Sequence, residues 1–221
     1  MDVSQALLER KSVRAFLNKP VDKELIVKTL YYARQAPSGT NTQPWEVAVV
    51  SGTTKKTLDR KLEDLFWQNS PKQMDYPYYP IEFPPEFKRR RVECGLQMYQ
   101  TLGIKKEDKE RRLNQWALNY SAFGAPVALF FFANKCIEKG SFIDYGMFLQ
   151  SIMLMATSLG LATCPQAALA EYPQIVKEEL GYPQDRILLC GMALGYEDKG
   201  ALINNYRTSR EKVTKFTQFF D

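Results

Sequence analysis

Two short apolar runs limit the fold of this chain more than any other feature of its sequence. They are residues 126–133 (PVALFFFA) and residues 186–194 (RILLCGMAL), and neither alternates between apolar and polar side chains. A short run of this kind indicates a β-strand that is covered on both faces. The sequence therefore predicts two central strands.

Periodicity and turn residues predict the elements around these strands. A third strand is expected at residues 45–50 (WEVAVV), after a polar loop at residues 38–44. Asp22 is suited to cap the second helix, which should end before Pro37. Helices are expected at residues 3–10, 21–36, 53–67, 88–103, 105–120, 142–160 and 172–180.

Residues 68–85 differ from the rest of the chain because prolines and aromatic residues are interleaved there. Neither a helix nor a β-ladder tolerates prolines at this density, so we expect an ordered excursion or a mobile lid. The aromatic side chains are candidates for stacking against a flat substrate, or they anchor the loop to its own domain. They are Tyr76, Tyr78, Tyr79 and Phe83.

The length and net charge of the chain limit the classes of protein to which it can belong. The chain has 221 residues, 45% of them apolar, and no repeat or linker, which predicts one domain over residues 1–221. Its net charge of +5 is spread along the sequence, which argues against a dedicated nucleic-acid binder. The surplus suits a cleft that attracts phosphate-bearing ligands, and an ordinary solvated surface accounts for it equally well.

Histidine is absent, and the four cysteines are isolated. Cys94, Cys136, Cys164 and Cys190 contain no pair at C-x-x-C spacing, so no metal site is expected. The lack of histidine excludes Ser-His and Cys-His nucleophiles. Cys164 has no neighbouring group to activate it, so we interpret it as a small residue rather than a redox thiol.

The sequence predicts a cytoplasmic protein without a membrane partner. Residues 142–160 are the most apolar long stretch but include Asp144, whereas a membrane span needs about 20 apolar residues. Residues 1–10 lack the apolar core of a signal peptide. Isolated cysteines fit a reducing compartment.

Two arginine motifs lie near opposite ends of the chain. Residues 10–14 (RKSVR) carry two arginines around Ser12, and residues 204–211 (NNYRTSRE) carry Arg207 and Arg210. Guanidinium forks and a serine hydroxyl suit a phosphate group. Taken singly, each motif also fits solvated arginines near a turn or in a tail.

Two further segments offer polar groups to a ligand. Residues 36–45 (APSGTNTQPW) present small polar side chains to a heterocycle, or they form a plain connection. Residues 160–166 (GLATCPQ) are expected to present backbone amides that neither a helix nor a strand uses. Those amides would pair with a ligand or within a buried turn.

In order and wording, these motifs together resemble the FMN-dependent nitroreductase family, in particular a nitrobenzoate-reductase-like branch. The likeness continues through GLATCPQAALAEYP, LLCGMALGYED and NNYRTSRE. It covers about residues 7–210 and is weakest at residues 68–85.

The resemblance implies a three-layer α+β fold, in which helices flank a central, mainly antiparallel sheet, and an intertwined homodimer. The apolar helix at residues 142–160 fits the core of that interface. One FMN is implied at each end of the interface. The residues implied for its phosphate and ribityl chain are Arg10, Lys11, Ser12, Arg14, Arg207 and Arg210.

The resemblance also assigns residues to the flavin ring and to the substrate. Pro37, Ser38 and Asn41 match a loop that the other subunit contributes to the ring, and Thr40 in that loop is a candidate for contacting substrate. A further segment is implied to lie against the far face of the flavin ring and its N5 edge. It consists of Cys164, Pro165, Gln166 and Ala167.

The implied activity is hydride transfer from NADH or NADPH, through flavin N5, to nitroaromatic, quinone or similar electron-poor acceptors. Donor and acceptor use the same slot in turn, which predicts ping-pong kinetics. No side chain receives a catalytic role, because the flavin carries the chemistry. Two alternatives stay open: a flavoprotein of the same fold that acts on one dedicated metabolite (flavin-consuming, dehalogenating or dehydrogenating), and a non-catalytic FMN-binding protein.

A nucleic-acid surface is a third alternative. Residues 88–91 (KRRR) and 105–112 are basic, but acidic residues interrupt them, as on an ordinary solvated helix face. No nucleic-acid partner is therefore expected. The interrupting residues are Glu93, Glu107, Asp108 and Glu110.

Overall fold

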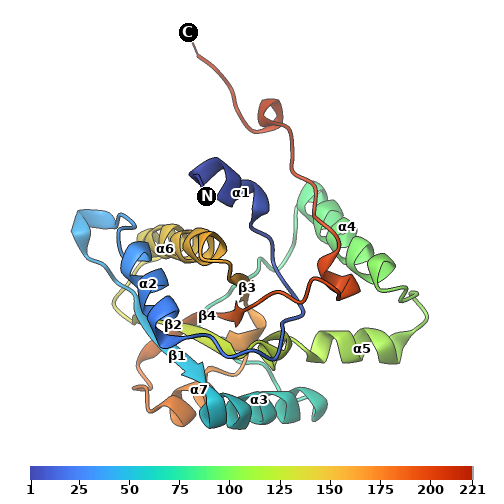
Figure 1. Cartoon of the computed structure of the whole chain (residues 1–221), viewed down its shortest axis with the longest axis horizontal. Helices are drawn as coiled ribbons and strands as arrows, with labels where there is room; N and C mark the ends of the chain where they lie inside the picture. Colours follow the sequence, from blue (N-terminus) through green and yellow to red (C-terminus); the bar gives the residue numbers. More distant parts are fainter. Residues whose placement is uncertain (221) are drawn as a thin grey trace.

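Four strands form one antiparallel sheet at the centre of the structure (Figure 1). In the computed structural model, which describes residues 1–220, the strands follow the order β1-β2-β4-β3 across the sheet. The two runs predicted as central strands, β2 and β4, do lie in the middle, so this prediction and the α+β class are confirmed. The bounds are β1 (Glu46–Ser51), β2 (Val127–Asn134), β3 (Ala162–Gln166) and β4 (Arg186–Gly195).

Seven α-helices accompany the sheet within residues 1–220, each where the sequence predicts one. They are α1 (Val3–Glu9), α2 (Lys23–Ala33), α3 (Gly52–Trp67), α4 (Pro85–Thr101), α5 (Lys109–Ala117), α6 (Lys139–Ser158) and α7 (Pro173–Leu180). Short 3-10 turns occur at η1 (Gly39–Asn41), η2 (Ala122–Gly124), η3 (Ala168–Ala170), η4 (Leu202–Asn204) and η5 (Val213–Lys215). Asp22 is the N-cap residue of α2, but its side chain makes no capping hydrogen bond.

Helix α5 is shorter than the predicted helix at residues 105–120. Before it, the Asp108 carboxylate accepts from the backbone N–H of Lys105 at 3.0 Å, which closes a turn instead of a helical repeat. Beyond it, Ala122 and Phe123 adopt positive φ angles of 52° and 55°. The first feature competes with helix inside the predicted range, and the second ends helical backbone just beyond that range.

Strand β2 explains why the fold has three layers. Its side chains alternate between the two sides of the sheet, and seven of its eight residues are buried. Ala128, Phe130 and Phe132 pack with residues of α3 and α7, whereas Leu129 and Phe131 pack with residues of α2 and α6. Helices therefore cover both faces, as expected from the family resemblance.

Residues 162–166 correct one prediction. Their backbone was expected to be free of any ladder, but they form β3, which pairs with β4 along its whole length. On its other side, Ser12 forms a parallel bridge with Thr163, and the N–H of Val13 donates to the Thr163 carbonyl at 3.0 Å. Proline is compatible with an edge strand, and the strand that pairs with β3 is remote in sequence.

Residues 68–84 form neither helix nor strand, as predicted. Lys177 is only 2% exposed, and its ammonium pairs with the Asp75 carboxylate at 2.8 Å. The hydroxyl of Tyr76 donates to the carbonyl of Leu189 at 2.7 Å. These buried contacts favour the ordered excursion over the lid.

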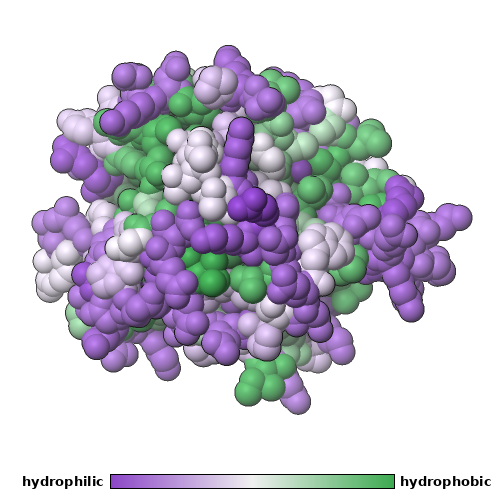
Figure 2. Space-filling model, turned by 90° about the horizontal axis from the view of Figure 1, so that it is seen from below, coloured by the Kyte–Doolittle hydropathy of each residue, from purple (hydrophilic) through white to green (hydrophobic). Residues whose placement is uncertain are grey.

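Apolar side chains are distributed unevenly over the surface. Figure 2 views the side of the molecule that carries α3 and α7, where hydrophilic side chains cover most of the face and separate the apolar groups. On α1 and α2, both of which contact α6, large apolar side chains are exposed instead. They include Leu7, Leu8, Val27, Tyr31 and Tyr32.

Residues 1–220 contain neither a candidate membrane-spanning helix nor a cluster of candidate metal ligands. None of the helices in this range combines the length and apolarity needed to cross a bilayer. No three histidine, cysteine, aspartate or glutamate side chains of residues 1–220 come together as metal ligands. All four cysteines are free thiols.

Candidate anion-binding and ring-binding site

The segment after α1 and the tail that follows β4 come together beside the outer edge of β3 (Figure 1). Helix α1 ends at Glu9, and the ψ of 127° at its C-cap residue, Arg10, turns the backbone into an extended segment along β3. Asn204, in the tail, is 2% exposed and joins the tail to this segment. Its side chain accepts from the N–H of Arg14 at 2.9 Å and donates to the carbonyl of Ala15 at 2.9 Å. A buried amide therefore fixes the backbone of the arginine motif.

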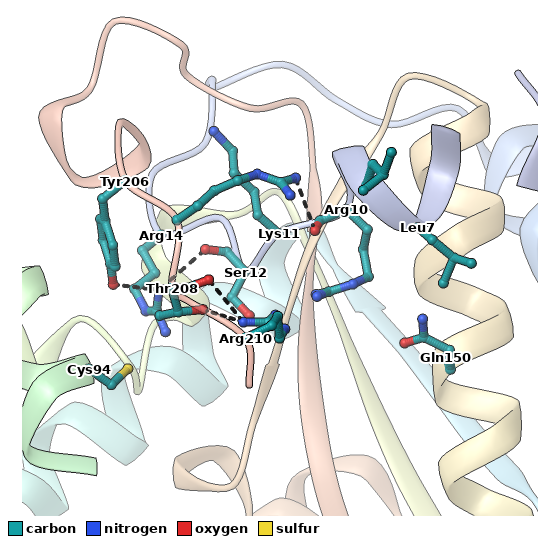
Figure 3. Close-up of a pocket in the computed structure, with 12 residues that line it drawn as sticks. Leu7, Arg10, Lys11, Ser12, Arg14, Cys94, Gln150, Tyr206, Thr208 and Arg210 are labelled. Carbon is teal, nitrogen blue, oxygen red and sulfur yellow. Dashed lines mark hydrogen bonds between the residues drawn. The ribbon is translucent and has the colours of Figure 1, made fainter. Parts of the chain in front are cut away.

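A cavity of about 480 Å³ lies at this junction and contains all six residues assigned to the phosphate and ribityl chain (Figure 3). We call it the arginine cavity. Its lining comes from α1, the arginine motif, α4, α6 and the tail: Leu7, Leu8, Arg10, Lys11, Ser12, Arg14, Cys94, Gln150, Tyr206, Arg207, Thr208 and Arg210.

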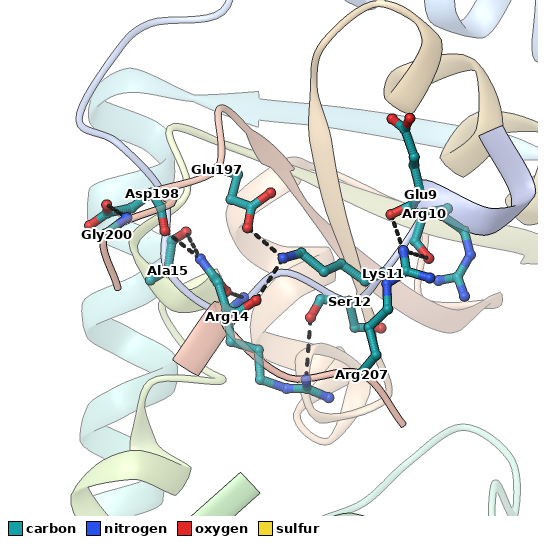
Figure 4. Close-up of polar contacts among 11 residues, drawn as sticks. Glu9, Arg10, Lys11, Ser12, Arg14, Ala15, Glu197, Asp198, Gly200 and Arg207 are labelled. Atoms are coloured by element: carbon teal, nitrogen blue, oxygen red, sulfur yellow. Dashed lines mark hydrogen bonds and ion pairs between the residues drawn. The ribbon is translucent and has the colours of Figure 1, made fainter. Parts of the chain in front are cut away.

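Besides Arg14, three guanidinium groups in the arginine cavity lack counter-charges among residues 1–220, namely those of Arg10, Arg207 and Arg210. Burial lowers the pKa of Arg10, and the facing charges of Arg210 and Arg207 lower it further. Arg207 donates to the carbonyls of Glu9 and Arg10, the second at 3.2 Å, so backbone dipoles hold it in position (Figure 4). Within residues 1–220, no carboxylate forms an ion pair with any of the three. An anion would relieve this repulsion.

The two remaining basic residues of the N-terminal motif differ in their partners. The Arg14 guanidinium donates to the Tyr206 hydroxyl at 3.1 Å and remains part of the lining. The Lys11 ammonium is turned to the Glu197 carboxylate at 2.7 Å and to the Asn204 carbonyl at 2.6 Å (Figure 4). The charge of Lys11 is therefore already compensated.

A second, smaller cavity of about 190 Å³ shares Arg14 with the arginine cavity. We call it the strand cavity, because the end of β3 forms one wall. The ring-binding candidates Cys164, Pro165, Gln166 and Ala167 all line it. The structure thus brings the candidates for phosphate and for ring to two cavities that meet at one arginine.

Gln166 has an unused hydrogen-bond acceptor beside the strand cavity. The residue is 5% exposed, and its Nε2 donates to the Asn119 carbonyl at 2.9 Å. Its Oε1 is buried and has no partner among the described residues. An unpaired buried acceptor costs about 1–3 kcal/mol, which a donor on a bound ligand would recover.

Cys164 behaves as a protonated, buried thiol. Burial raises its pKa to about 11, although the nearby Arg14 and Arg10 charges act in the opposite direction. At neutral pH the side chain is therefore a small uncharged group. This agrees with its interpretation as a packing residue.

No residue of the polar loop between α2 and β1 lines either cavity. Thr40 and Asn41 adopt positive φ angles of 48° and 59°, which non-glycine residues seldom do. The Asp144 carboxylate accepts from the N–H of Gly39 at 3.2 Å and holds the loop against α6. Four site candidates are thus not brought to the cavities of this single chain: Pro37, Ser38, Thr40 and Asn41.

The four aromatic substrate candidates stay together as a chain of neighbouring rings, but they differ in their relation to the strand cavity. Tyr79 lines the strand cavity, whereas the hydroxyl of Tyr76 is used to anchor the excursion. Tyr78 stacks edge-on against Tyr79, with ring centroids 4.7 Å apart. Phe83 packs under the guanidinium of Arg91, with the ring centroid 4.0 Å from Cζ.

Sequence reasoning missed several residues that line the two cavities. In the arginine cavity these include Tyr206 and Gln150, and in the strand cavity they include Arg91 and Trp116. For Arg91 a signal was present: Arg89 and Arg90 have glutamates four positions away, whereas Phe87 and Gly95 stand four positions from Arg91.

Sequence comparison finds relatives that match nearly the whole chain. A family model described as the nitroreductase family matches residues 7–196. A 4-nitrobenzoate reductase of Pseudomonas putida is 37% identical over 218 residues, which cover 99% of this chain and 95% of that protein.

Structure comparison finds the same kind of protein. An FMN- and NADPH-dependent nitroreductase, NfnB from Sphigopyxis sp. strain HMH, superposes with a TM-score of 0.96 at 35% identity, covering 100% of both chains. The FMN-dependent nitroreductase NfnB of Mycobacterium smegmatis, solved in complex with NADPH, gives a TM-score of 0.93 at 33% identity, again over 100% of both chains.

Proposed function

This chain belongs to the nitroreductase family, and we propose from this that it is an FMN-dependent oxidoreductase that transfers reducing equivalents from NADH or NADPH to nitroaromatic or quinone-like acceptors. The matches cover 95% of the 4-nitrobenzoate reductase and 100% of the NfnB structure, so the comparison extends over nearly all of both proteins. One observation in this chain carries the proposal: the arginine cavity.

The groups that line the arginine cavity fit the phosphate of FMN. Arg10, Arg207 and Arg210 converge without a carboxylate among residues 1–220, and Ser12 adds a hydroxyl. Paired guanidinium forks bind phosphate more strongly than neutral donors do. In this proposal Arg14, which borders both cavities, lies between the phosphate and the ring.

The strand cavity is proposed to hold the flavin ring. Pro165 and Ala167 supply a small, apolar wall, and the free Oε1 of Gln166 supplies an acceptor for a ring N–H. When bound, FMN supplies the hydride chemistry, so the protein needs no acid–base side chain of its own. The residues of the chain bind, orient and shield the ring.

We further propose one domain over residues 1–221, a homodimer, and a cytoplasmic location. Exposed apolar side chains on α1 and α2 offer a surface for a second copy. The strained loop at Thr40 and Asn41 lines neither cavity of its own chain, which fits a contribution to the site of the partner. Four free thiols are compatible with the cytoplasm.

The test is spectroscopic and uses the purified protein. We expect a yellow protein whose flavin absorbance is bleached by NADH or NADPH without oxygen and restored by a nitroarene or a quinone. Bleaching without restoration would support the alternative of a dedicated metabolite. A yellow protein that neither nucleotide bleaches would support non-catalytic binding.

The dimer has its own measurement. Analytical ultracentrifugation of the FMN-loaded protein should give twice the mass of one chain, which is 25.5 kDa. A monomer that retains FMN would contradict the proposed shared site.

A further inference from the structure

Arg91 in α4 is a charged residue to which the proposed binding of the phosphate and of the flavin ring gives no role. Its guanidinium lies over the Phe83 ring at 4.0 Å and over the Tyr79 ring at 5.1 Å. It also lines the strand cavity, together with Pro165 and Trp116. Two aromatic rings therefore hold a guanidinium in place at the wall of the proposed reaction site.

The charge of Arg91 is uncompensated, unlike that of its neighbours. Arg89 pairs with Glu93 at 2.8 Å, and Arg90 pairs with Glu211 at 2.9 Å. No carboxylate within residues 1–220 lies within ion-pair distance of Arg91. The run of three arginines thus contains two solvated ion pairs and one free cation.

The carboxylate that lines the same cavity is already engaged. Glu171 pairs with the Lys72 ammonium at 2.9 Å and accepts a hydrogen bond from the Tyr120 hydroxyl. It therefore does not neutralise Arg91. The cavity combines aromatic walls with a guanidinium that is free to bind an anion.

We propose that Arg91 binds the carboxylate of an aromatic acid and thereby makes nitro-substituted aromatic acids the preferred acceptors of this enzyme. The inference rests on the proposed function, since it requires the acceptor to stack on a flavin ring that is bound in the strand cavity. A planar guanidinium pairs with a carboxylate through two parallel hydrogen bonds, which a neutral amide of the same shape cannot reproduce. Tyr79 and Trp116 suit the flat ring of such a ligand.

The test compares 4-nitrobenzoate with 4-nitrobenzamide, an uncharged ligand of similar shape. Calorimetric titration of the oxidised, FMN-loaded protein, without nicotinamide, gives a Kd for each. We expect Arg91→Gln to weaken binding of the acid about 10- to 100-fold relative to the amide, as for the loss of a charged hydrogen-bonded pair. The ratio of kcat/KM for the two acceptors should shift in the same direction.

Arg90→Gln is the matched control. It removes one positive charge one position away, at a residue that is paired with Glu211 and does not line the strand cavity. The acid-to-amide ratio should stay within about twofold of the parent value. Arg91→Lys keeps the charge but loses the fork, so its ratio should fall between those of the parent and Arg91→Gln.

Three results would overturn the inference. Equal weakening of acid and amide in Arg91→Gln would mean that Arg91 only holds Tyr79 and Phe83 in place. If the acid-to-amide binding ratio is unchanged in both Arg91 variants, Arg91 does not contact the carboxylate. Weaker binding of NADPH, with the acid unaffected, would assign Arg91 to a nucleotide phosphate. Failure of the proposed function looks different: the acid binds, but no nitroarene reoxidises the flavin.

Discussion

Two groups of arginines lie near each other in this structure and differ in their partners. Arg10, Arg207 and Arg210 face one another across the arginine cavity, whereas Arg89 and Arg90 on α4 pair with glutamates. The hydrogen bond from Arg89 to Glu93 raises the pKa of Arg89. Burial and the facing guanidinium groups lower the pKa of Arg10. The contrast identifies the first group as the one that needs an anion.

Arg91 extends this comparison. It belongs to the second group by its position in the sequence, but it lacks a carboxylate partner among residues 1–220 and lines a cavity. By these two criteria it resembles the first group. A basic run in a sequence can therefore contain residues with different functions, and their acidic neighbours separate them.

The largest effect is expected when arginines of the first group, which line the arginine cavity, are removed. Replacing both Arg10 and Arg210 with alanine should weaken FMN binding at least about 100-fold, since each charged hydrogen bond contributes about 1.5–3 kcal/mol. Fluorescence titration of FMN into the apoprotein measures this. The variant should remain a folded dimer, because neither side chain belongs to the buried core.

The control removes the second group. Replacing Arg89 and Arg90 with glutamine changes the net charge by the same amount, but both side chains are exposed and paired. We expect FMN affinity within about twofold of the parent, as for surface ion pairs in general. If the two double variants lose FMN equally, long-range charge rather than the arginine cavity sets the affinity.

The pH dependence of stability should reflect the buried thiols of Cys164 and Cys190. Burial raises the pKa of Cys190 to about 12 and that of Cys164 to about 11, and only Cys164 has arginines nearby that act against burial. The folded state therefore retains the Cys164 proton above the thiol's ordinary value of 9. Its stabilising effect is complete below pH 9 and is lost as the pH rises towards 11.

The expected loss from Cys164 is about 2–3 kcal/mol between those pH values, from about 1.4 kcal/mol per unit of pKa shift. Urea unfolding at pH 8 to 11 should give a shallower decline for Cys164→Ala than for the parent. An identical decline in both proteins would mean that Cys164 titrates no differently in the folded chain.

The smallest effect is expected at Lys11. Its ammonium is held by Glu197 at 2.7 Å, so Lys11→Met should change FMN affinity by less than about threefold. The lost pair should lower the free energy of unfolding by about 0.5–1 kcal/mol, because both partners are partly exposed. FMN titration and urea unfolding of the same variant provide the two numbers. If Lys11→Met weakens FMN binding as much as the double replacement of Arg10 and Arg210 does, Lys11 does bind the phosphate.

Much of the fold could be predicted because its signals are local. The apolar runs that became β2 and β4 lie in the centre of the sheet, and all seven helices occur at predicted positions. Strand β3 could not be recognised, since its ladder depends on β4 and on Ser12, both remote in sequence.

The site could be predicted only in part for a similar physical reason. The arginine motifs carry their chemistry in the residue types themselves, so their convergence was foreseen. The roles of Asn204, Lys11 and Arg91 depend on which groups lie beside them after folding. Asn204 is buried where the tail joins the segment after α1, and Lys11 is turned away to Glu197.

The central claim is that guanidinium groups from both ends of the chain bind the phosphate of FMN. Its most direct test is to titrate the apoprotein with FMN and with riboflavin, which has the same ring and ribityl chain but no phosphate. The account predicts that FMN binds at least about 100-fold more tightly than riboflavin. Equal affinity for the two flavins would contradict it.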